Sequence, residues 1–195
     1  MVLRNERTRA TRERILNAAA QLFTRDGIRT TSVDTISDLA GLTKVTLYKH
    51  FRSKDELIAE VLEREENQWR TWFLDQVNTI AQKPEDRLVA AFDVLSEWFS
   101  QDGFRGSPFI NTAMEVMDSA HPVHPILAKH RAANREFFRS NAEAAGFSDP
   151  KMVEDALILL FRGAIVSALL EPMPDIANLA RRTAEAVIQA QVSRI

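Results

Sequence analysis

A short run of basic and hydroxyl-bearing residues carries the clearest chemistry in this sequence. In TKVTLYKHF, residues 43–51, Leu47 and Phe51 are four apart, which places both on the buried face of a helix. Ammonium and hydroxyl groups suit phosphate oxygens, lysine can donate to guanine O6 and N7, and valine can touch a thymine methyl group. The opposite face has no acidic residue and carries Lys44, Val45, Tyr48 and Lys49.

A second helix and a glycine turn are expected to position this basic face. Ile36, Leu39 and Ala40 recur at helical spacing and predict one buried face. Gly41 follows at a place where a left-handed residue commonly ends a helix. Thr43 can then cap the basic helix by accepting a hydrogen bond from a backbone N–H. Helix, glycine turn and basic helix form the helix-turn-helix pattern, whose second helix enters the DNA major groove.

Several short motifs in this region also carry a family resemblance. They are LFTRDG at 22–27, GL at 41–42, TLY at 46–48, HF at 50–51 and SKDEL at 53–57. These motifs resemble the amino-terminal signature of tetracycline-repressor-type (TetR family) regulators. The match covers residues 8–58, and the remainder resembles the family only in being helical and of suitable length.

The resemblance implies roles for individual side chains. Lys44 and Val45 would lie against base edges, whereas Lys49 would contact either bases or backbone. Phosphates would be held by Thr46, Tyr48, His50 and Lys54. The alternative for Tyr48 is a half-buried core position, and for His50 it is capping or packing at the end of its helix. From the residue types themselves, Thr31 or Ser32 is expected to cap the helix that follows, and Ser32 would do so with or without a phosphate contact. The expected DNA-binding residues are Ser32, Thr43, Lys44, Val45, Thr46, Tyr48, Lys49, His50 and Lys54.

Charge is distributed unevenly along the chain. The 195 residues have a net charge of −2, yet residues 1–54 hold 11 Lys/Arg and 5 Asp/Glu, a net of +6. Residues 55–195 hold 14 and 22, a net of −8. This asymmetry is expected when only one end of a protein meets phosphate. Residues 1–7 are expected to form a mobile arm, either solvated or reaching a minor groove.

Composition favours a helical protein, with only 6 glycines and 7 prolines. The absence of cysteine excludes disulfides and thiolate metal sites and fits a cytoplasmic location. The apolar stretch 156–170 is too short to span a membrane and is expected to be buried on all sides as a helix. The amino terminus lacks the apolar segment of a signal peptide.

These patterns predict an all-α fold of about nine helices in two domains. Residues 1–52 would form the helix-turn-helix domain, and residues 53–195 a ligand-binding and dimerisation domain. Ser53 and Glu56 form a capping box that opens a helix reaching about residue 80. This long helix would connect the two domains.

Large apolar side chains in the second domain admit two interpretations, a plain core or the lining of a ligand cavity. The resemblance implies a cavity. Arg162 lies in an apolar helix and needs a partner or an anionic ligand. The candidate pocket residues are Trp69, Phe73, Phe92, Trp98, Phe99, Met114, Met117, Phe137, Phe161 and Arg162.

The last two helices are expected to form a dimer interface, as in the family, although an intramolecular core would use the same residue types. A two-fold dimer would read both halves of a palindromic operator. The candidate interface residues are Ala164, Ile165, Ala168, Leu169, Ala180, Ala184, Val187 and Ile188.

No enzymatic, metal or cofactor site is expected. His121, His124 and His130 lack accompanying cysteines or clustered carboxylates, and nucleotide-binding and hydrolase motifs are missing. We predict a homodimeric DNA-binding transcriptional repressor, released from its operator by a small apolar or amphipathic effector. The alternatives are a helical enzyme or carrier, and a polyanion-binding module without operator recognition; activation in place of repression would depend on promoter position.

Overall fold

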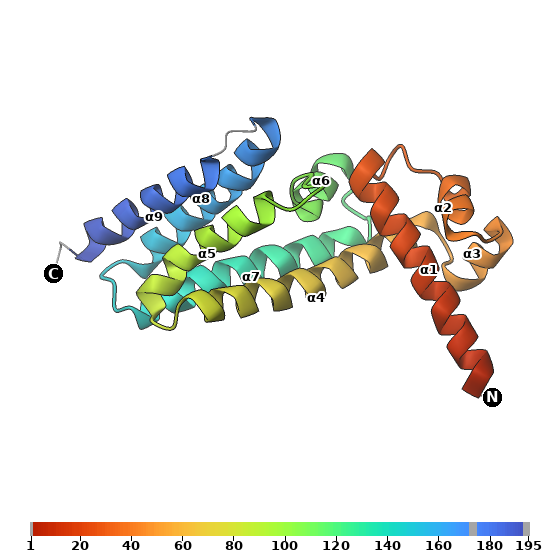
Figure 1. The fold of residues 1–195 in the computed structure, drawn as a ribbon, viewed down its shortest axis with the longest axis horizontal. Helices are drawn as coiled ribbons and strands as arrows, with labels where there is room; N and C mark the ends of the chain where they lie inside the picture. The colour runs from red at the N-terminus through yellow and green to blue at the C-terminus, as the bar shows by residue number, and fades with distance from the viewer. Residues whose placement is uncertain (1, 172–174, 193–195) are drawn as a thin grey trace. The chain divides into compact units, whose positions relative to one another are not determined.

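The structure, a computed structural model, describes residues 2–171 and 175–192. These residues form nine α-helices and no strand (Figure 1), which confirms the predicted fold class. The helices are α1 (Val2–Asp26), α2 (Val33–Ala40), α3 (Lys44–His50), α4 (Lys54–Ile80), α5 (Pro84–Phe99), α6 (Pro108–Glu115), α7 (Val123–Ala144), α8 (Pro150–Leu170) and α9 (Ile176–Val192). No helix in the described ranges has both the length and the hydropathy needed to cross a bilayer.

The chain packs as two compact units, each assembled from two segments. The first unit contains Met1–Asn67 and Pro108–Ala128, and the second contains Gln68–Ser107 and Lys129–Ile195. Both α4 and α7 therefore contribute residues to each unit. The predicted domain boundary after residue 52 stays a prediction. By packing, the start of α4 and all of α6 belong to the same unit as α1, α2 and α3.

The first unit is built around an apolar core shared by α1 to α4. Leu47 and Phe51 are fully buried there, as their spacing predicts. The guanidinium of Arg12 lies 4.6 Å from the centre of the Phe51 ring and is paired with Glu60. This stacking fixes the end of α3 against both α1 and α4. The core consists of Ile15, Leu16, Ala18, Ala19, Leu22, Ile36, Ala40, Leu47, Phe51, Leu57 and Val61.

The prediction of an arm before the first helix is wrong for residues 2–7, because α1 begins at Val2. Met1 lies outside the described residues. The segment from Val2 to Arg14 contains no proline or glycine and is rich in arginine, which favours helix. Thr11 also donates its hydroxyl to the Arg7 carbonyl 2.9 Å away, one turn earlier. Helical order therefore extends through the basic amino-terminal segment.

In the second unit, α9 packs against α5 and α8, and α5 also packs against α8. The starts of α5 and α8 follow the sequence: Pro84 opens α5 without a side-chain cap, and Asp149 caps α8 by accepting from the Met152 N–H at 2.9 Å. The expectation that α8 is buried on all sides is wrong. Leu159 and Leu170 are 76% and 72% exposed, because neighbouring helices cover only part of its circumference.

Candidate DNA-binding surface

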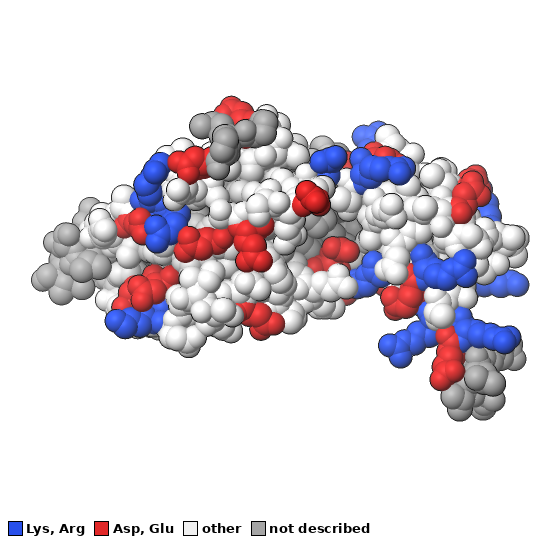
Figure 2. All heavy atoms as spheres, in the orientation of Figure 1, with Lys and Arg blue, Asp and Glu red and all other residues white. Residues whose placement is uncertain are grey.

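The exposed side of α3 presents the chemistry predicted from its sequence. Val45 is 66% exposed and Tyr48 45% exposed, whereas Leu47 between them is fully buried. Lys44 and Lys49 are exposed as well. A thymine-methyl contact, hydroxyl donors and two ammonium groups are thus available on one side of a short helix. On the face shown in Figure 2, Lys and Arg side chains gather along α1 of the same unit.

Two side-chain caps set the starts of α2 and α3. Ser32 Oγ accepts from the Thr35 N–H at 3.0 Å, and Thr43 Oγ1 accepts from the Thr46 N–H at 3.2 Å. Each bond satisfies a backbone donor that the first turn of a helix leaves without an intrahelical partner. Both predicted caps are confirmed.

The turn between α2 and α3 depends on Gly41. Its φ of 64° lies in the left-handed region, as predicted, and its N–H donates to the Asp38 carbonyl at 3.0 Å. Arg14 Nη2 donates to the Ala40 carbonyl at 2.5 Å, so α1 neutralises the end of α2. A Cβ at position 41 would lie 3.0 Å from the same Arg14 nitrogen.

The predicted buried face of α2 needs one correction. Leu39 is 46% exposed, while Ser37 is buried and Ile36 and Ala40 are buried as expected. Ser37 tolerates burial because its hydroxyl donates to the Val33 carbonyl at 2.9 Å. The hydrophobic spacing alone did not distinguish these neighbouring positions.

Lys44 is paired within the unit. Its Nζ lies 3.0 Å from Asp34 Oδ1, and hydrogen bonding to that carboxylate raises the pKa of Lys44. Both groups are exposed, so a base edge or a phosphate can replace Asp34 as the partner at little cost. The pair holds the lysine at the amino-terminal end of α3, where it was expected to meet bases.

Two side chains, Glu115 and Lys54, hold the turn between α1 and α2 from two sides, and we call this pair the clamp. Glu115 Oε2, at the end of α6, accepts from the Arg29 N–H at 2.9 Å. Lys54 Nζ, at the start of α4, donates to the Ile28 carbonyl at 2.5 Å, and burial lowers the pKa of Lys54. The predicted phosphate contact of Lys54 stays a prediction, since an ammonium has further donors. The clamp fixes the turn that leads to the Ser32 cap.

The start of α4 is secured by the predicted capping box. The Glu56 N–H donates to Ser53 Oγ at 3.1 Å, and Glu56 Oε2 accepts from the Arg52 N–H at 2.6 Å. His121 Nε2 lies 3.3 Å from Asp55 Oδ1 in the same unit. Among the described residues no three potential metal ligands come together.

The predicted pocket residues divide into core and surface. Phe73, Phe92, Phe137 and Phe161 are buried and pack mostly edge to face, with Phe161 ring centroids 5.9 Å from Phe73 and 6.0 Å from Phe92. Such contacts belong to a filled interior. Trp69 and Trp98 are in ring contact at 4.4 Å and are partly exposed.

Two other members of that set, both methionines, lie elsewhere than expected. Met114 and Met117 are 70% and 77% exposed, so the prediction that they face inward is wrong; α6 ends at Glu115, before Met117. Arg162 is half-buried, where burial and the nearby charges of Arg135 and Arg131 lower its pKa.

The predicted dimer interface also needs correction. Ala164, Ile165, Ala180, Ala184 and Ile188 are buried within the single chain and serve its own core. The exposed side of α8 instead carries Leu159, Gly163, Val166 and Leu170, at intervals of four, three and four residues. Leu169 is 43% exposed, and Ala168 and Val187 are half-buried.

Sequence reasoning missed residues that hold the DNA-binding helices from a distance. No role was predicted for Arg12 or Arg14, and Glu115 stands at no distinctive spacing in the sequence. Glu115 and Arg29 are 86 residues apart, so no local pattern connects them. Positive charges on a helix that also has a buried face are the one signal that could have indicated Arg12 and Arg14.

Comparison with known proteins agrees with this geometry. A sequence profile described as "Bacterial regulatory proteins, tetR family" matches residues 15–61, which span α1 to the start of α4. The HTH-type transcriptional regulator YjdC of Escherichia coli K12 is 22% identical over 178 residues, covering 91% of this chain and 93% of its own. The HTH-type transcriptional regulator QacR of Staphylococcus aureus is 28% identical over 89 residues, or 45% of this chain and 47% of its own.

Solved structures extend the similarity to both units. A TetR-type transcriptional regulator from Streptomyces avermitilis is 30% identical with a TM-score of 0.82, over 93% of this chain and 97% of its own. SCO4454, a TetR-family transcriptional regulator from Streptomyces coelicolor, is 26% identical with a TM-score of 0.86, over 93% and 89%.

Fold and surface together define an all-helical DNA-binding protein of the helix-turn-helix class. The chain belongs to the TetR family of bacterial regulatory proteins. It is accordingly a DNA-binding transcriptional regulator, of a kind that typically works as a dimer and responds to ligands.

Proposed function

We propose that this protein is a homodimeric repressor that binds a palindromic operator and leaves it when a small molecule binds the second unit. The observation that carries the proposal is the exposed face of α3, on which Lys44, Val45 and Tyr48 are available while Leu47 anchors the helix. Operator binding places the protein with chromosomal DNA in the cytoplasm.

Base reading is assigned to the amino-terminal end of α3. Lys44 exchanges Asp34 for guanine O6 and N7, and Val45 contacts a thymine methyl group. Tyr48 and Thr46 donate hydroxyl groups to phosphates, and Ser32 and Thr43 combine capping with backbone contacts at helix starts. Lys49, His50 and Lys54 complete the set on the phosphate side.

A second copy of the chain is the proposed partner of the exposed α8 face. Leu159, Val166 and Leu170 offer apolar area, and Gly163 between them permits close approach of another helix. Leu179 of α9 is 47% exposed and adds to the same kind of surface. A two-fold axis pairs this face with itself and presents two copies of α3 to two half-sites.

Effector binding needs only a modest difference between states. A hundredfold loss of operator affinity corresponds to about 2.7 kcal/mol of differential binding. Such a difference lies within the range of a single well-placed small molecule.

Selection of binding sites from random DNA with the purified protein tests the function. We expect a palindromic sequence, and a fall in log affinity with log salt of about 0.9 for each phosphate neutralised. Lys44→Ala should relax specificity at one position of each half-site, whereas Tyr48→Phe should weaken binding to all sequences. Recovery of no preferred sequence, or a flat salt dependence, would contradict the proposal.

A further inference from the structure

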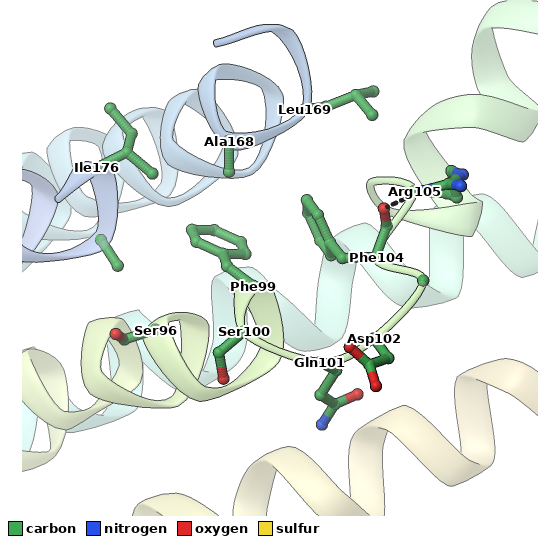
Figure 3. A pocket seen from close by; sticks show the side chains of 12 residues that line it. Ser96, Phe99, Ser100, Gln101, Asp102, Phe104, Arg105, Ala168, Leu169 and Ile176 are labelled. Atoms are coloured by element: carbon green, nitrogen blue, oxygen red, sulfur yellow. Dashed lines mark hydrogen bonds between the residues drawn. The ribbon is translucent and has the colours of Figure 1, made fainter. Parts of the chain in front are cut away.

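A cleft of about 630 Å³ opens in the second unit, between the segment that follows α5 and the facing ends of α8 and α9 (Figure 3). This volume lies within the range of small-molecule sites, roughly 300–1,000 Å³. Of the predicted pocket residues, Phe99 lines it, together with Ala168 and Leu169 from the predicted interface. Phe104, which sequence reasoning passed over, supplies a second ring.

The apolar part of the cleft is made by two phenylalanines facing a small residue. The Phe99 and Phe104 ring centroids are 5.0 Å apart at 53°. In Figure 3 both rings point toward Ala168, whose methyl group leaves open the space that a larger side chain would fill. Ile176 and Leu169 extend this surface on the helix side. Flat apolar groups fit such a surface, because offset and tilted ring contacts are favourable.

The segment that carries Phe104 is held in one shape. Gly103 and Gly106 have φ values of 81° and 80°, in the left-handed region, and the Phe104 N–H donates to the Gln101 carbonyl at 3.2 Å. Phe104 also packs edge-on against Trp98, with centroids 5.2 Å apart. The aromatic wall is therefore formed before any ligand arrives.

Charge around the cleft is balanced and lies outside its apolar part. Asp102 and Arg105 contribute one charge of each sign, and both are exposed. Figure 3 shows Asp102 directed away from the two phenylalanine rings. Arg105 Nη1 donates to the Phe104 carbonyl at 3.1 Å. A charged ligand placed against the rings would lose hydration there without a counter-charge beside it, so this part of the cleft favours a neutral molecule.

We propose that this cleft is the effector site, and that it takes a neutral, flat, largely apolar molecule stacked against Phe99 and Phe104. The inference rests on the proposed function, since it assumes that a ligand controls operator binding. A small molecule suits the space better than a helix of a second copy, which is about 10 Å wide with its side chains and needs a long groove.

The cleft has a direct chain connection to the DNA-binding unit. The segment 100–107 runs without interruption into α6, and α6 ends at Glu115, which holds the Arg29 N–H. A ligand that displaces or orders Phe104 acts on the residues that lead into this clamp. The signal is thereby carried by α6 in addition to α4.

Titration with N-phenyl-1-naphthylamine, a neutral planar fluorophore, tests the site on the full-length protein. We expect one probe per chain, enhanced probe emission and a change in tryptophan emission, because Trp98 contacts Phe104. Ala168→Phe fills the cleft and should weaken probe binding about tenfold or more. Ala132→Phe makes the same change at an exposed position of α7 and should leave binding unchanged.

A second variant distinguishes loss of probe binding from loss of the folded state. Phe104→Ala removes one wall from an irregular segment and should also weaken the probe, while thermal unfolding reports whether each variant is folded. The probe should raise the melting temperature of the wild type and Ala132→Phe only. Absence of probe binding by the wild type, or unchanged binding by folded Ala168→Phe, would overturn the proposal.

Operator binding without the probe separates this inference from the function on which it rests. If no operator is bound, the proposed function fails whatever the probe does. With operator present, the probe should lower wild-type affinity about tenfold or more, and Glu115→Ala, which removes the acceptor of the Arg29 N–H, should reduce that ratio. An unchanged ratio in Glu115→Ala would contradict transmission through α6, and probe binding that leaves operator affinity unaltered would count against the cleft as the effector site.

Discussion

The α2–α3 region and the α8–α9 pair contain helices whose positions are fixed in different ways. In the former, Ser32 and Thr43 bond to backbone groups three residues away, and Gly41 supplies the turn. In the latter, α8 is apolar on nearly every side, and neighbouring helices determine which residues are covered. Leu157 is fully buried while Leu159 is 76% exposed, although the two are the same residue type.

This contrast shows which kind of interaction determines the helix positions in each region. Local hydrogen bonds give the DNA-binding helices their geometry, and the residue types that form such bonds are few. Apolar packing tolerates many residue types. The exposed leucines on α8 become buried only if a second apolar surface packs against them. The first region should therefore be sensitive to small changes of stereochemistry, and the second to changes of polarity.

The largest effect is expected from removing the ring that anchors α3. Phe51→Ala deletes a fully buried ring and the Arg12 stacking, and should lower the free energy of unfolding by about 3–5 kcal/mol. Leu159→Ala, at a position exposed in the single chain, should change it by less than about 0.5 kcal/mol when measured at protein concentrations below the dimer dissociation constant. Urea denaturation of both variants measures the difference, and equal losses would show that the two regions are not distinct in this way.

Polarity on α8 should affect assembly more than folding. Leu159→Glu should raise the dimer dissociation constant about tenfold or more, because a charge would be buried at the two-fold contact. Analytical ultracentrifugation over a concentration series measures this constant. Ala132→Glu, at an exposed position of α7, is the matched control. A dimer unaffected by Leu159→Glu would exclude this face from the interface.

The next largest effect is expected from changing the backbone stereochemistry at Gly41, in the turn between α2 and α3. Gly41→Ala adds a Cβ at a φ of 64° and 3.0 Å from Arg14 Nη2, and should cost about 1–2 kcal/mol of stability. Operator affinity, measured by fluorescence anisotropy, should fall with it, because the same turn orients α3. Gly146→Ala has a comparable φ of 74° with open space around it and provides the control in the second unit.

The smallest effect concerns pH. Burial lowers the pKa of Lys54 in the folded state, so between that value and the ordinary pKa the unfolded chain binds more protons. The contribution of this group to stability should thus rise with pH across that interval. Free energies of unfolding from about pH 8 to 10.5 should climb more steeply in the wild type than in Lys54→Arg, which stays charged. Parallel curves would show that Lys54 titrates normally.

Much of the first unit was predictable because its signals are local. Gly41 and Thr43 were assigned correctly, Ser32 was one of two candidate caps, and the capping box predicted the start of α4. The apolar spacing that follows predicted an end near residue 80, and the helix ends at Ile80. Leu39 and Ser37 were exchanged because hydrophobic spacing takes no account of the bond from Ser37 to Val33. The amino-terminal helix was underestimated because charged residues were read as a solvated arm.

The second unit was less predictable because its features arise from distant segments. The cleft brings Phe104 and Ala168 together across more than sixty residues of sequence. Which sides of α8 and α9 are buried depends on how these helices pack against α5. The apolar stripe of α5 does not specify which helix covers it. Exposed Met114 and Met117 illustrate the same point, since apolar residue type alone suggested an interior position.

The clamp on the turn after α1 also determines when, during synthesis of the chain, the first unit can be completed. The first unit is completed by residues 108–128, which leave the ribosome after the whole helix-turn-helix sequence has emerged. At about 5–20 residues per second, the nascent α1–α3 segment waits several seconds for its Glu115 contact. The first unit is therefore completed only when about two-thirds of the chain has been made, and the segment that adjoins the cleft is already present by then.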